Sequence, residues 1–314
     1  MPETLPVTVL TGFLGAGKTT LLNAWLTEYP RGDVAVVVNE HGTTGIDGEI
    51  LASRVETLVE ITGGCVCCTT QHDLVRTLGE LSSRQPPFTR IFVETSGAAS
   101  PAGVLRAIAR AQAEPALVLD GVVTVVDATR MSVLAEHDLA IEQVAYADVI
   151  VLTRADACDA EALSRAEEAI AVQNGIAVVG RAARGELRDT LEALLARRQA
   201  DLPSPRLVPP APASHAYESL SLHLDGEVDG ERFADFVETE LGRFAGRLLR
   251  TKGILAVEGV DARMILQGVA DLVEVTFGER WGSAPRTSRL VVVGFGLDRE
   301  ALSRGFTNCA FSHG

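Results

Sequence analysis

The sequence has no apolar run long enough to cross a membrane and no recognisable secretion signal. Its first residues, MPETLP, lack the positive cluster and apolar core of a signal peptide. No apolar run approaches the roughly 18 residues that a membrane-spanning helix needs. We therefore expect a cytoplasmic protein that does not insert into a membrane.

Basic residues are scarce. The chain holds 28 Lys and Arg against 42 Asp and Glu, which gives a formal net charge of −14. Because nucleic acids and anionic membranes both attract surplus positive charge, this balance argues against either as a partner. An acidic surface instead suits cations and protein partners.

Cysteines are also few, and three of the five lie together in the segment GGCVCC, residues 63–68. An odd cysteine count without a secretion signal argues against a disulfide framework, since the cytosol keeps thiols reduced. Cys65, Cys67 and Cys68 supply up to three thiolates, which are soft ligands that select Zn²⁺, Co²⁺ or Cu⁺ over Mg²⁺. No second cysteine pair completes a closed four-ligand zinc site, so the incomplete set suits a metal carrier. A redox pair and simple packing of small buried thiols remain as alternatives.

Short β-branched runs alternate with helical patterns from the start of the chain to about residue 198. This order predicts parallel strands joined by crossover helices, and the nearly continuous apolar runs predict a sheet covered on both faces. The expected fold class is therefore α/β with a mostly parallel, doubly wound sheet. The predicted strands span residues 7–11, 34–38, 90–94, 122–127, 149–153 and 176–180.

A proline-rich stretch, DLPSPRLVPPAPASH, divides the chain at residues 201–215. It holds five of the 13 prolines and predicts an extended linker between a first domain at 1–200 and a second at 216–314. The second domain is expected to be a smaller α+β domain. Its predicted strands span 219–224, 254–259, 264–269 and 290–295, and its predicted helices span about 231–246 and 298–309.

The motif GFLGAGKTT, residues 12–20, lies between a predicted strand and an amphipathic helix. In a loop of this type the backbone N–H groups and the helix amino terminus together hold a polyphosphate, which predicts a P-loop NTPase. Lys18 is expected to neutralise the β and γ phosphates, and the Thr19 hydroxyl is expected to bind Mg²⁺. The predicted nucleotide contacts are Gly12, Gly15, Ala16, Gly17, Lys18, Thr19 and Thr20.

The segment RIFVETSG adds an acid and a glycine just beyond a buried strand. Ligands of a doubly wound sheet bind at the carboxyl ends of the strands, which is where Glu94 falls. Glu94 is predicted to organise Mg²⁺ or the attacking water, and the N–H of Gly97 to sense the γ-phosphate. Together with Lys18, these are the predicted catalytic residues.

A third segment, Thr153, Arg154, Ala155 and Asp156, ends the strand VIVL. The Asp156 carboxylate can accept hydrogen bonds from the N1–H and the 2-amino group of guanine. Adenine lacks both donors, so the segment predicts GTP as the nucleotide.

With these segments assembled, the chain resembles the CobW-like GTPases, of the CobW, HypB and UreG type, a P-loop family of metallochaperones. The clustered cysteines, written CxCC, are the most specific mark of this resemblance. The matching stretches of the first domain are GFLGAGKTT, the NEHG to GIDG segment at 39–48, GGCVCC, ETSG, DGVVTVVDA and QVAYADVIVLTRAD. Those of the second are RTKGIL, ILQGV and RLVVVGFGLD.

The resemblance implies a GTPase that cleaves the phosphoanhydride bond of GTP with Mg²⁺ and delivers Zn²⁺ or Co²⁺ to a client protein. It implies that residues 39–47 form a nucleotide-sensing switch. Cys65, Cys67 and Cys68 would then bind the transition metal, with Glu40 as an additional ligand. A homodimer is left open.

Three departures from the family pattern affect these expectations. The usual guanine motif is Asn-Lys-x-Asp, whereas this chain has Thr153 and Arg154, so Thr153 loses the amide that buttresses the loop and GTP preference is expected to be less strict. His41 stands where an aromatic residue is common; it could add a soft-metal ligand, but a lone histidine beside a loop is more often exposed to solvent or bonded locally. The six histidines are scattered, so metal intake is expected to depend on the cysteines or on a donor protein.

The order of the motifs suggests a mechanism. The cysteines lie between the predicted switch and Glu94, so GTP could close the metal site and hydrolysis could open it. Two alternatives are a metal reservoir or regulatory adaptor with incidental hydrolysis, and a small-molecule kinase with a structural metal. Asp156 and the CxCC motif argue against the kinase.

Overall fold

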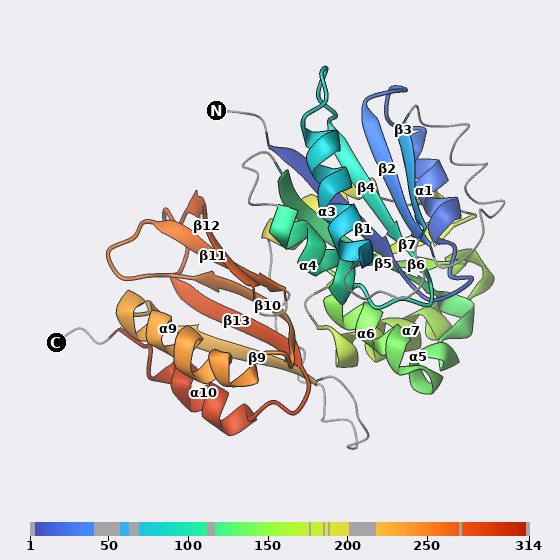
Figure 1. The fold of residues 1–314 in the computed structure, drawn as a ribbon. Helices are drawn as coiled ribbons and strands as arrows, with labels where there is room; N and C mark the ends of the chain where they lie inside the picture. Colours follow the sequence, from blue (N-terminus) through green and yellow to red (C-terminus); the bar gives the residue numbers. More distant parts are fainter. Residues whose placement is uncertain are drawn as a thin grey trace. The chain divides into compact units, whose positions relative to one another are not determined.

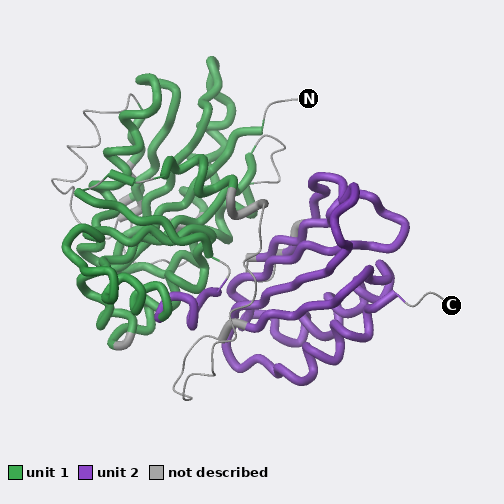
Figure 2. Tube along the Cα trace, turned by 180° about the vertical axis from the view of Figure 1, so that it is seen from behind, with its two compact units in different colours: residues 1–168, 177–200 green, residues 169–176, 201–314 purple. Residues whose placement is uncertain are grey.

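The chain forms two compact units in a computed structural model (Figure 2). The structure describes residues 4–40, 57–62, 69–111, 117–175, 177–184, 186–187, 189–200, 218–269 and 272–311. One unit contains residues 1–168 and 177–200, and the other contains residues 169–176 and 201–314. The predicted linker at 201–215 lies outside the described residues, so the predicted domain limits stay a prediction.

The first unit is built on one mostly parallel sheet (Figure 1). Within the described residues its strand order is β3-β2-β4-β1-β5-β6-β7-β8, and every neighbouring pair is parallel except β7 with β8. The predicted α/β fold with a doubly wound sheet is confirmed. The strands are β1 (Leu5–Thr11), β2 (Val34–Glu40), β3 (Thr57–Thr62), β4 (Arg90–Thr95), β5 (Leu117–Asp127), β6 (Val149–Thr153), β7 (Val178–Ala183) and β8 (Glu186–Leu187).

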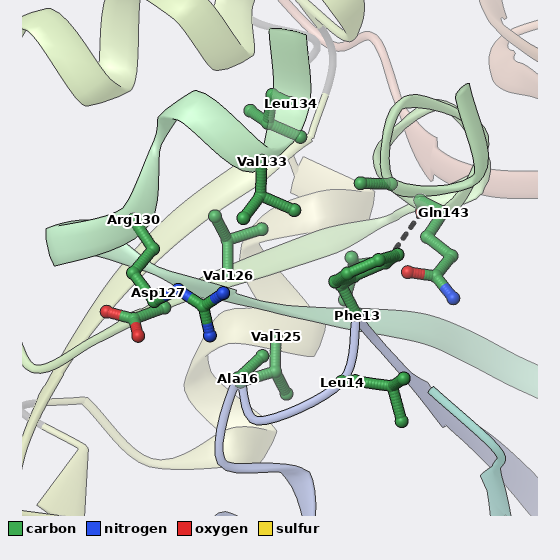
Figure 3. A pocket seen from close by; sticks show the side chains of 12 residues that line it. Phe13, Leu14, Ala16, Val125, Val126, Asp127, Arg130, Val133, Leu134 and Gln143 are labelled. Atoms are coloured by element: carbon green, nitrogen blue, oxygen red, sulfur yellow. Dashed lines mark hydrogen bonds between the residues drawn. The ribbon is translucent and has the colours of Figure 1, made fainter. Parts of the chain in front are cut away.

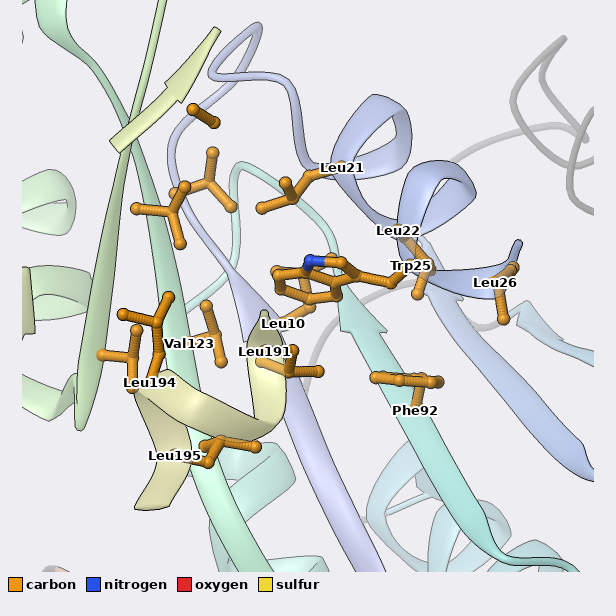
Figure 4. Packing of buried hydrophobic residues seen from close by; sticks show 14 of the residues in the cluster. Leu10, Leu21, Leu22, Trp25, Leu26, Phe92, Val123, Leu191, Leu194 and Leu195 are labelled. Carbon is orange, nitrogen blue, oxygen red and sulfur yellow. The ribbon is translucent and has the colours of Figure 1, made fainter. Parts of the chain in front are cut away.

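Helices cover both faces of this sheet, so adjacent strand residues such as Val9 and Leu10 are both fully buried. Helices α1 and α8 share one apolar cluster, in which Trp25 stacks on Phe92 with ring centroids 6.1 Å apart (Figure 4). Helices α3 and α4 pack side by side. The helical segments are α1 (Lys18–Leu26), α3 (Thr69–Ser82), α4 (Ala102–Ala111), η1 (Ala128–Arg130), α5 (Ser132–Glu136), α6 (Asp138–Tyr146), η2 (Ala155–Ala157), α7 (Ala160–Gln173) and α8 (Leu191–Ala200).

The six strands predicted for this unit are present, and β3 and the two-residue strand β8 are additional. The sequence of β3, TLVEIT, has only six residues and a charged residue in its centre. β3 also lies at the edge of the sheet, where only β2 pairs with it. A short edge strand needs less apolar sequence than a central one, so the pattern did not reveal it.

The second unit is an α+β domain with an antiparallel sheet. Within the described residues its strand order is β12-β11-β10-β13-β9, and an apolar cluster joins one face of the sheet to its helices. The elements are β9 (Glu218–Asp225), α9 (Gly230–Phe236), η3 (Val237–Leu241), η4 (Gly242–Phe244), β10 (Leu248–Leu255), β11 (Ala262–Val269), β12 (Leu272–Arg280), β13 (Thr287–Gly294) and α10 (Arg299–Thr307). None of the helices in the described part of the chain is both long and apolar enough to cross a bilayer.

Two predictions for this unit were wrong in their limits. The strand predicted at 254–259 is β10, which runs from Leu248 to Leu255. Its charged residues Arg250 and Lys252 are buried in the sheet. Because they interrupt the apolar pattern, the first half of the strand was not predicted. After Leu255 the chain leaves the ladder, and the carbonyl of Ala256 accepts a hydrogen bond from the N–H of Val228 at 2.7 Å. The helix predicted at 231–246 is divided into α9, the π-helical η3 and the 3-10 turn η4.

Candidate nucleotide site at the phosphate loop

The phosphate loop connects β1 to α1 and passes directly over β5. A Cβ atom on Gly12 would lie 2.3 Å from the carbonyl oxygen of Val125, and Gly12 has a φ of 142°, so only glycine fits this position. Gly15 and Gly17 also have positive φ angles, 76° and 99°. Gly17 is the N-cap of α1, and no side chain caps this helix. The first-turn N–H groups of α1 are therefore suited to hold an anion.

Lys18, the first residue of α1, lies under this loop. Its side chain is largely buried, with 9% of the residue exposed, and its Nζ donates a hydrogen bond to the carbonyl oxygen of Gly12 at 2.8 Å. Phosphate oxygens are stronger acceptors for an ammonium group than a neutral carbonyl. A bound polyphosphate would therefore recruit a lysine that the loop already holds at its centre.

Thr19 and Glu94 come together at the carboxyl ends of β1 and β4. The Thr19 hydroxyl donates a hydrogen bond to Oε1 of Glu94 at 2.8 Å, and Glu94 is only 6% exposed. The two residues are far apart in sequence, and the parallel pairing of Leu10 with Glu94 places them together. A hydroxyl beside a carboxylate is an oxygen donor set of the kind that Mg²⁺ prefers, so these residues fit the predicted ion.

Gly97 lies against the phosphate loop just beyond β4. A Cβ atom on Gly97 would lie 2.8 Å from the backbone nitrogen of Leu14. The carbonyl oxygens of Gly97 and Ala99 accept hydrogen bonds from Nε2 of Gln143, at 3.4 and 3.1 Å. Gln143 is 1% exposed in α6 and was not predicted as a site residue. The only feature of the sequence that could have indicated a role for Gln143 is that a polar amide stands among the apolar residues of the buried face of its helix.

Thr153 contacts the phosphate loop directly. Its hydroxyl donates a hydrogen bond to the carbonyl oxygen of Ala16 at 2.7 Å and lies 3.3 Å from that of Val126. Thr153 lacks the asparagine amide, but its hydroxyl is close enough to link to the phosphate loop itself. The guanine segment and the phosphate loop therefore remain joined. The expected relaxation of GTP preference stays a prediction.

Arg154 provides a second link between the two segments. It has a left-handed backbone conformation with a φ of 53°, and its Nη2 donates to the carbonyl oxygen of Gly15 at 3.3 Å. Its Nη1 forms an ion pair with Oδ2 of Asp127. Asp127 ends β5 and is itself fixed, because its Oδ1 accepts hydrogen bonds from the backbone N–H and hydroxyl of Thr129 at 3.0 and 2.7 Å. Sequence analysis did not identify Asp127 as a site residue.

The substitution Asp127→Asn tests this link. We expect it to speed GDP release about fivefold, because Arg154 loses its ionic partner while the pair is partly open to solvent. Release of a fluorescent GDP analogue measures the effect. Arg154→Lys, which retains the positive charge, serves as the conservative control. If Asp127→Asn has the same effect in an Arg154→Ala background, Asp127 does not act through Arg154.

Asp156 is accessible to a ligand. It lies in η2, its side chain is 42% exposed, and its nearest described ion-pair partner is Nε of Arg184 at 3.8 Å. This contact is long and Arg184 is 90% exposed, so the pair contributes little and leaves the carboxylate open to a base. The role of Asp156 in guanine recognition stays a prediction. Thr20, on the first turn of α1, is exposed.

A small cavity lies beside the phosphate loop and is lined mainly by apolar side chains (Figure 3). Phe13 borders it and stacks on His137 with ring centroids 4.7 Å apart. Its volume of about 30 Å³ is far below the several hundred Å³ of ordinary ligand pockets. This cavity is therefore a packing feature of the loop and cannot hold a nucleotide.

The predicted transition-metal site lies mostly outside the described residues. This holds for Cys65, Cys67 and Cys68, for the switch residues from His41 onward, and for the side chain of Glu40. Within the part of the chain that the structure describes, no three His, Cys, Asp or Glu side chains form a metal-binding group. The cysteine site therefore stays a prediction.

Cys309 belongs to the core of the second unit. It is 1% exposed, and its Sγ lies 3.3 Å from the carbonyl oxygen of Gly305. Burial, with a further contribution from the charge of Asp229, raises the pKa of the thiol to about 11. Cys309 is thus protonated at neutral pH and packs as an apolar residue.

Two family models match the chain and together cover both units. The CobW/HypB/UreG nucleotide-binding domain matches residues 6–180, and the cobalamin synthesis protein cobW C-terminal domain matches residues 217–310. The zinc chaperone CobW of Pseudomonas aeruginosa is 35% identical over 346 residues, covering 95% of this chain and 90% of the relative. The zinc chaperone YjiA of Escherichia coli is 31% identical, covering 96% of this chain and 98% of the relative.

Solved structures agree with these matches. The crystal structure of Zn(II)-bound YjiA GTPase from E. coli superposes with a TM-score of 0.70 at 26% identity. The alignment covers 98% of this chain and 100% of that structure. The likeness therefore extends over both units and includes the phosphate loop and the second, antiparallel sheet.

Proposed function

The chain belongs to the CobW/HypB/UreG family, and on this premise we propose that it is a GTP-hydrolysing metallochaperone that binds zinc and delivers it to a client protein. The observation that carries the proposal is the phosphate loop. Lys18 lies at its centre, and the Thr19 hydroxyl is bonded to Glu94. Zinc is chosen over cobalt because the curated relatives are named zinc chaperones.

Each residue of the site has a separate role in GTP hydrolysis. The amino terminus of α1 and Lys18 bind the β and γ phosphates, and Thr19 with Glu94 holds Mg²⁺. When bound there, Mg²⁺ would neutralise the negative charge on the phosphate oxygens. The backbone N–H of Gly97 orients the γ-phosphate. Asp156 accepts hydrogen bonds from guanine, and Thr153 and Arg154 keep its segment attached to the loop.

The sheet provides the connection between nucleotide and zinc. In register, Asn39 of β2 pairs with Thr95 of β4, and Glu40 pairs with Thr62 of β3. The carboxyl ends of these three strands therefore lie side by side, next to Glu94. Cys65 follows Thr62 by three residues in the sequence. On this basis we propose that Glu40 and the CxCC segment share one ion and that a nucleotide at Glu94 affects its binding.

The client receives zinc after hydrolysis releases the switch. The protein acts in the cytoplasm, where thiols are reduced and available as ligands. A homodimer would place two such sites in one assembly, and its formation can be measured by light scattering with and without GTP.

A metal titration tests the proposal. Reduced, metal-free protein is titrated with Co²⁺, followed by its thiolate charge-transfer band, and with Zn²⁺ against a chelator. Each titration is run with Mg²⁺ and either GDP or a non-hydrolysable GTP analogue. We expect at least about tenfold tighter binding with the analogue, which corresponds to an ordinary allosteric coupling.

The substitution Cys67→Ser provides the control. It is expected to abolish the thiolate band and spare GTP binding. Equal metal affinity with both nucleotides would contradict the coupling, because a ligand with no differential affinity shifts no equilibrium. Loss of GTP binding in the metal-free Cys67→Ser protein would contradict the assignment of two separate sites.

A further inference from the structure

The second unit has a concave surface of about 470 Å³ on the face of its sheet opposite α9 and α10. His223 on β9 lies between Leu222 and Leu224, which both belong to the cluster shared with the helices, so His223 points to the other face. Arg289 of β13 pairs in register with His223 on one side and with Ile254 of β10 on the other. These residues form one band across the sheet.

This surface is rich in hydrogen-bond donors. Arg263, Arg289 and His223 line it from three different strands, and no Asp or Glu is among its described lining residues. His223 has its Nε2 2.7 Å from Oδ1 of Asp225, a side chain that is 90% exposed. Arg263 and Arg289 place two positive charges at this surface in a chain with a net charge of −14, which favours an anionic ligand here.

Trp281 gives a second, independent sign of a ligand. The residue lines the surface and is only 6% exposed, yet its indole N–H has no hydrogen-bond partner among the described residues. The Nε of Arg263 is likewise buried without a partner in the described part of the chain, and the guanidinium lies 5.0 Å over the Trp281 ring. Buried donors without acceptors are rare in folded proteins. A ligand that carries acceptors would satisfy both.

The spacing of the donors identifies the kind of ligand. From β11 to β9 there are three strand spacings, and Arg263 is two residues along β11 from Ile265, which pairs with Ile254, so Arg263 and His223 lie about 16 Å apart. One carboxylate or one phosphate cannot reach both. In an extended peptide, side chains at alternate positions project on the same side about 7 Å apart, so three alternating acidic residues span this distance. Ile254 and Pro285 offer apolar contacts between them.

We infer that this surface binds an extended acidic segment of a partner protein, with carboxylates at alternate positions facing His223, Arg289 and Arg263. The inference concerns the second unit alone and does not rest on the proposed GTPase function.

Binding of a short peptide with glutamate at every second position tests the inference on the full-length protein. Fluorescence anisotropy of a labelled peptide measures affinity, and tryptophan emission reports the site, because Trp25 is buried in the core of the other unit. Arg263→Gln and Arg289→Gln are each expected to weaken binding about fivefold, as partly exposed ion pairs allow. Added salt is expected to weaken binding further.

Matched variants distinguish a specific site from general attraction. Arg243→Gln, which removes the same charge from an exposed helical turn, is expected to leave peptide affinity unchanged. Trp281→Phe keeps an aromatic ring but removes the N–H and is expected to weaken binding. Thermal unfolding shows whether each variant remains folded, and Arg289→Gln keeps the test valid if Arg263→Gln does not fold.

Four results would overturn the inference. A peptide with glutamine in place of glutamate could bind equally well, which would remove the role of charge. Free glutamate or inorganic phosphate could compete at the concentration of the peptide, which would indicate a simple anion site. If the peptide does not bind, or if Arg243→Gln loses as much peptide affinity as Arg263→Gln and Arg289→Gln, this surface does not bind an acidic segment specifically.

Discussion

Replacement of Lys18 by alanine is expected to lower GTP affinity by about 1,000-fold. The ammonium group lies at the centre of the phosphate loop and would form charge-assisted hydrogen bonds to two phosphates, each contributing about 1.5 to 3 kcal/mol. Isothermal titration calorimetry with GDP and with a GTP analogue measures the loss. GTP hydrolysis is expected to fall with binding.

A second variant separates the charge of Lys18 from its packing. Lys18 is largely buried, so alanine also removes the contacts of its aliphatic stem. Lys18→Met keeps most of the stem and is expected to lose as much affinity as Lys18→Ala. Thermal unfolding without nucleotide monitors the fold. Binding of GTP within a few-fold of the unmodified protein would show that Lys18 is not a phosphate ligand.

Gly97→Ala is expected to reduce the kcat of GTP hydrolysis by about 100-fold. Its new methyl group would lie 2.8 Å from the backbone nitrogen and 2.9 Å from the Cα of Leu14, so either the phosphate loop or the segment after β4 must move. A displacement of about 1 Å at a reacting centre can cost two orders of magnitude in rate. Single-turnover hydrolysis and nucleotide affinity, measured together, separate the effect on chemistry from that on binding.

Gly79→Ala is the matched control for this experiment. Gly79 lies within α3, and a Cβ atom there meets nothing within 4 Å. Alanine is favoured over glycine in a helix by up to about 1 kcal/mol, so this variant should be as active as the unmodified protein and slightly more stable. If Gly97→Ala also hydrolyses GTP at the normal rate, Gly97 has no role in sensing the γ-phosphate.

The parts of the site that could be predicted from sequence are those whose geometry is local or follows from strand order. The phosphate loop is one uninterrupted motif between a strand and a helix. Glu94 was identified because parallel strands end at the same edge of a sheet, and the structure brings it to Thr19. The parallel sheet itself followed from the continuous apolar runs of its strands.

The supporting residues could not be predicted, because their roles depend on contacts between distant segments. From the sequence, Asp127 can be recognised only as an acidic residue at the end of a strand. The pairing of β5 with β6 is what brings it to Arg154. Gln143 supports the loop of Gly97 from a helix more than 40 residues away. The contact made by Thr153 could not be predicted for a similar reason, since whether a hydroxyl can replace an amide depends on the exact position of the Ala16 carbonyl.

The second sheet was harder to predict because buried charges interrupt its apolar pattern. Arg250, which is 2% exposed, lies in β10 and donates a hydrogen bond to the carbonyl oxygen of Gly268 at 3.1 Å. Pattern analysis assumes that charged residues face solvent, which is usually correct because an unpaired buried charge is costly. Here a partner on the adjacent strand β11 compensates for that cost.

The side-by-side ends of β2, β3 and β4 have a kinetic consequence. The last rungs of the hydrogen-bonded ladder that joins these ends can open by local fraying, without movement of a whole unit. Loop motions of this kind take nanoseconds to microseconds. Bond cleavage in GTP is far slower, at about 1 s⁻¹ or below without an activating partner. The interval between zinc deliveries would then be set by the lifetime of bound GTP. A client that accelerates GTP hydrolysis would therefore determine the rate at which it receives zinc.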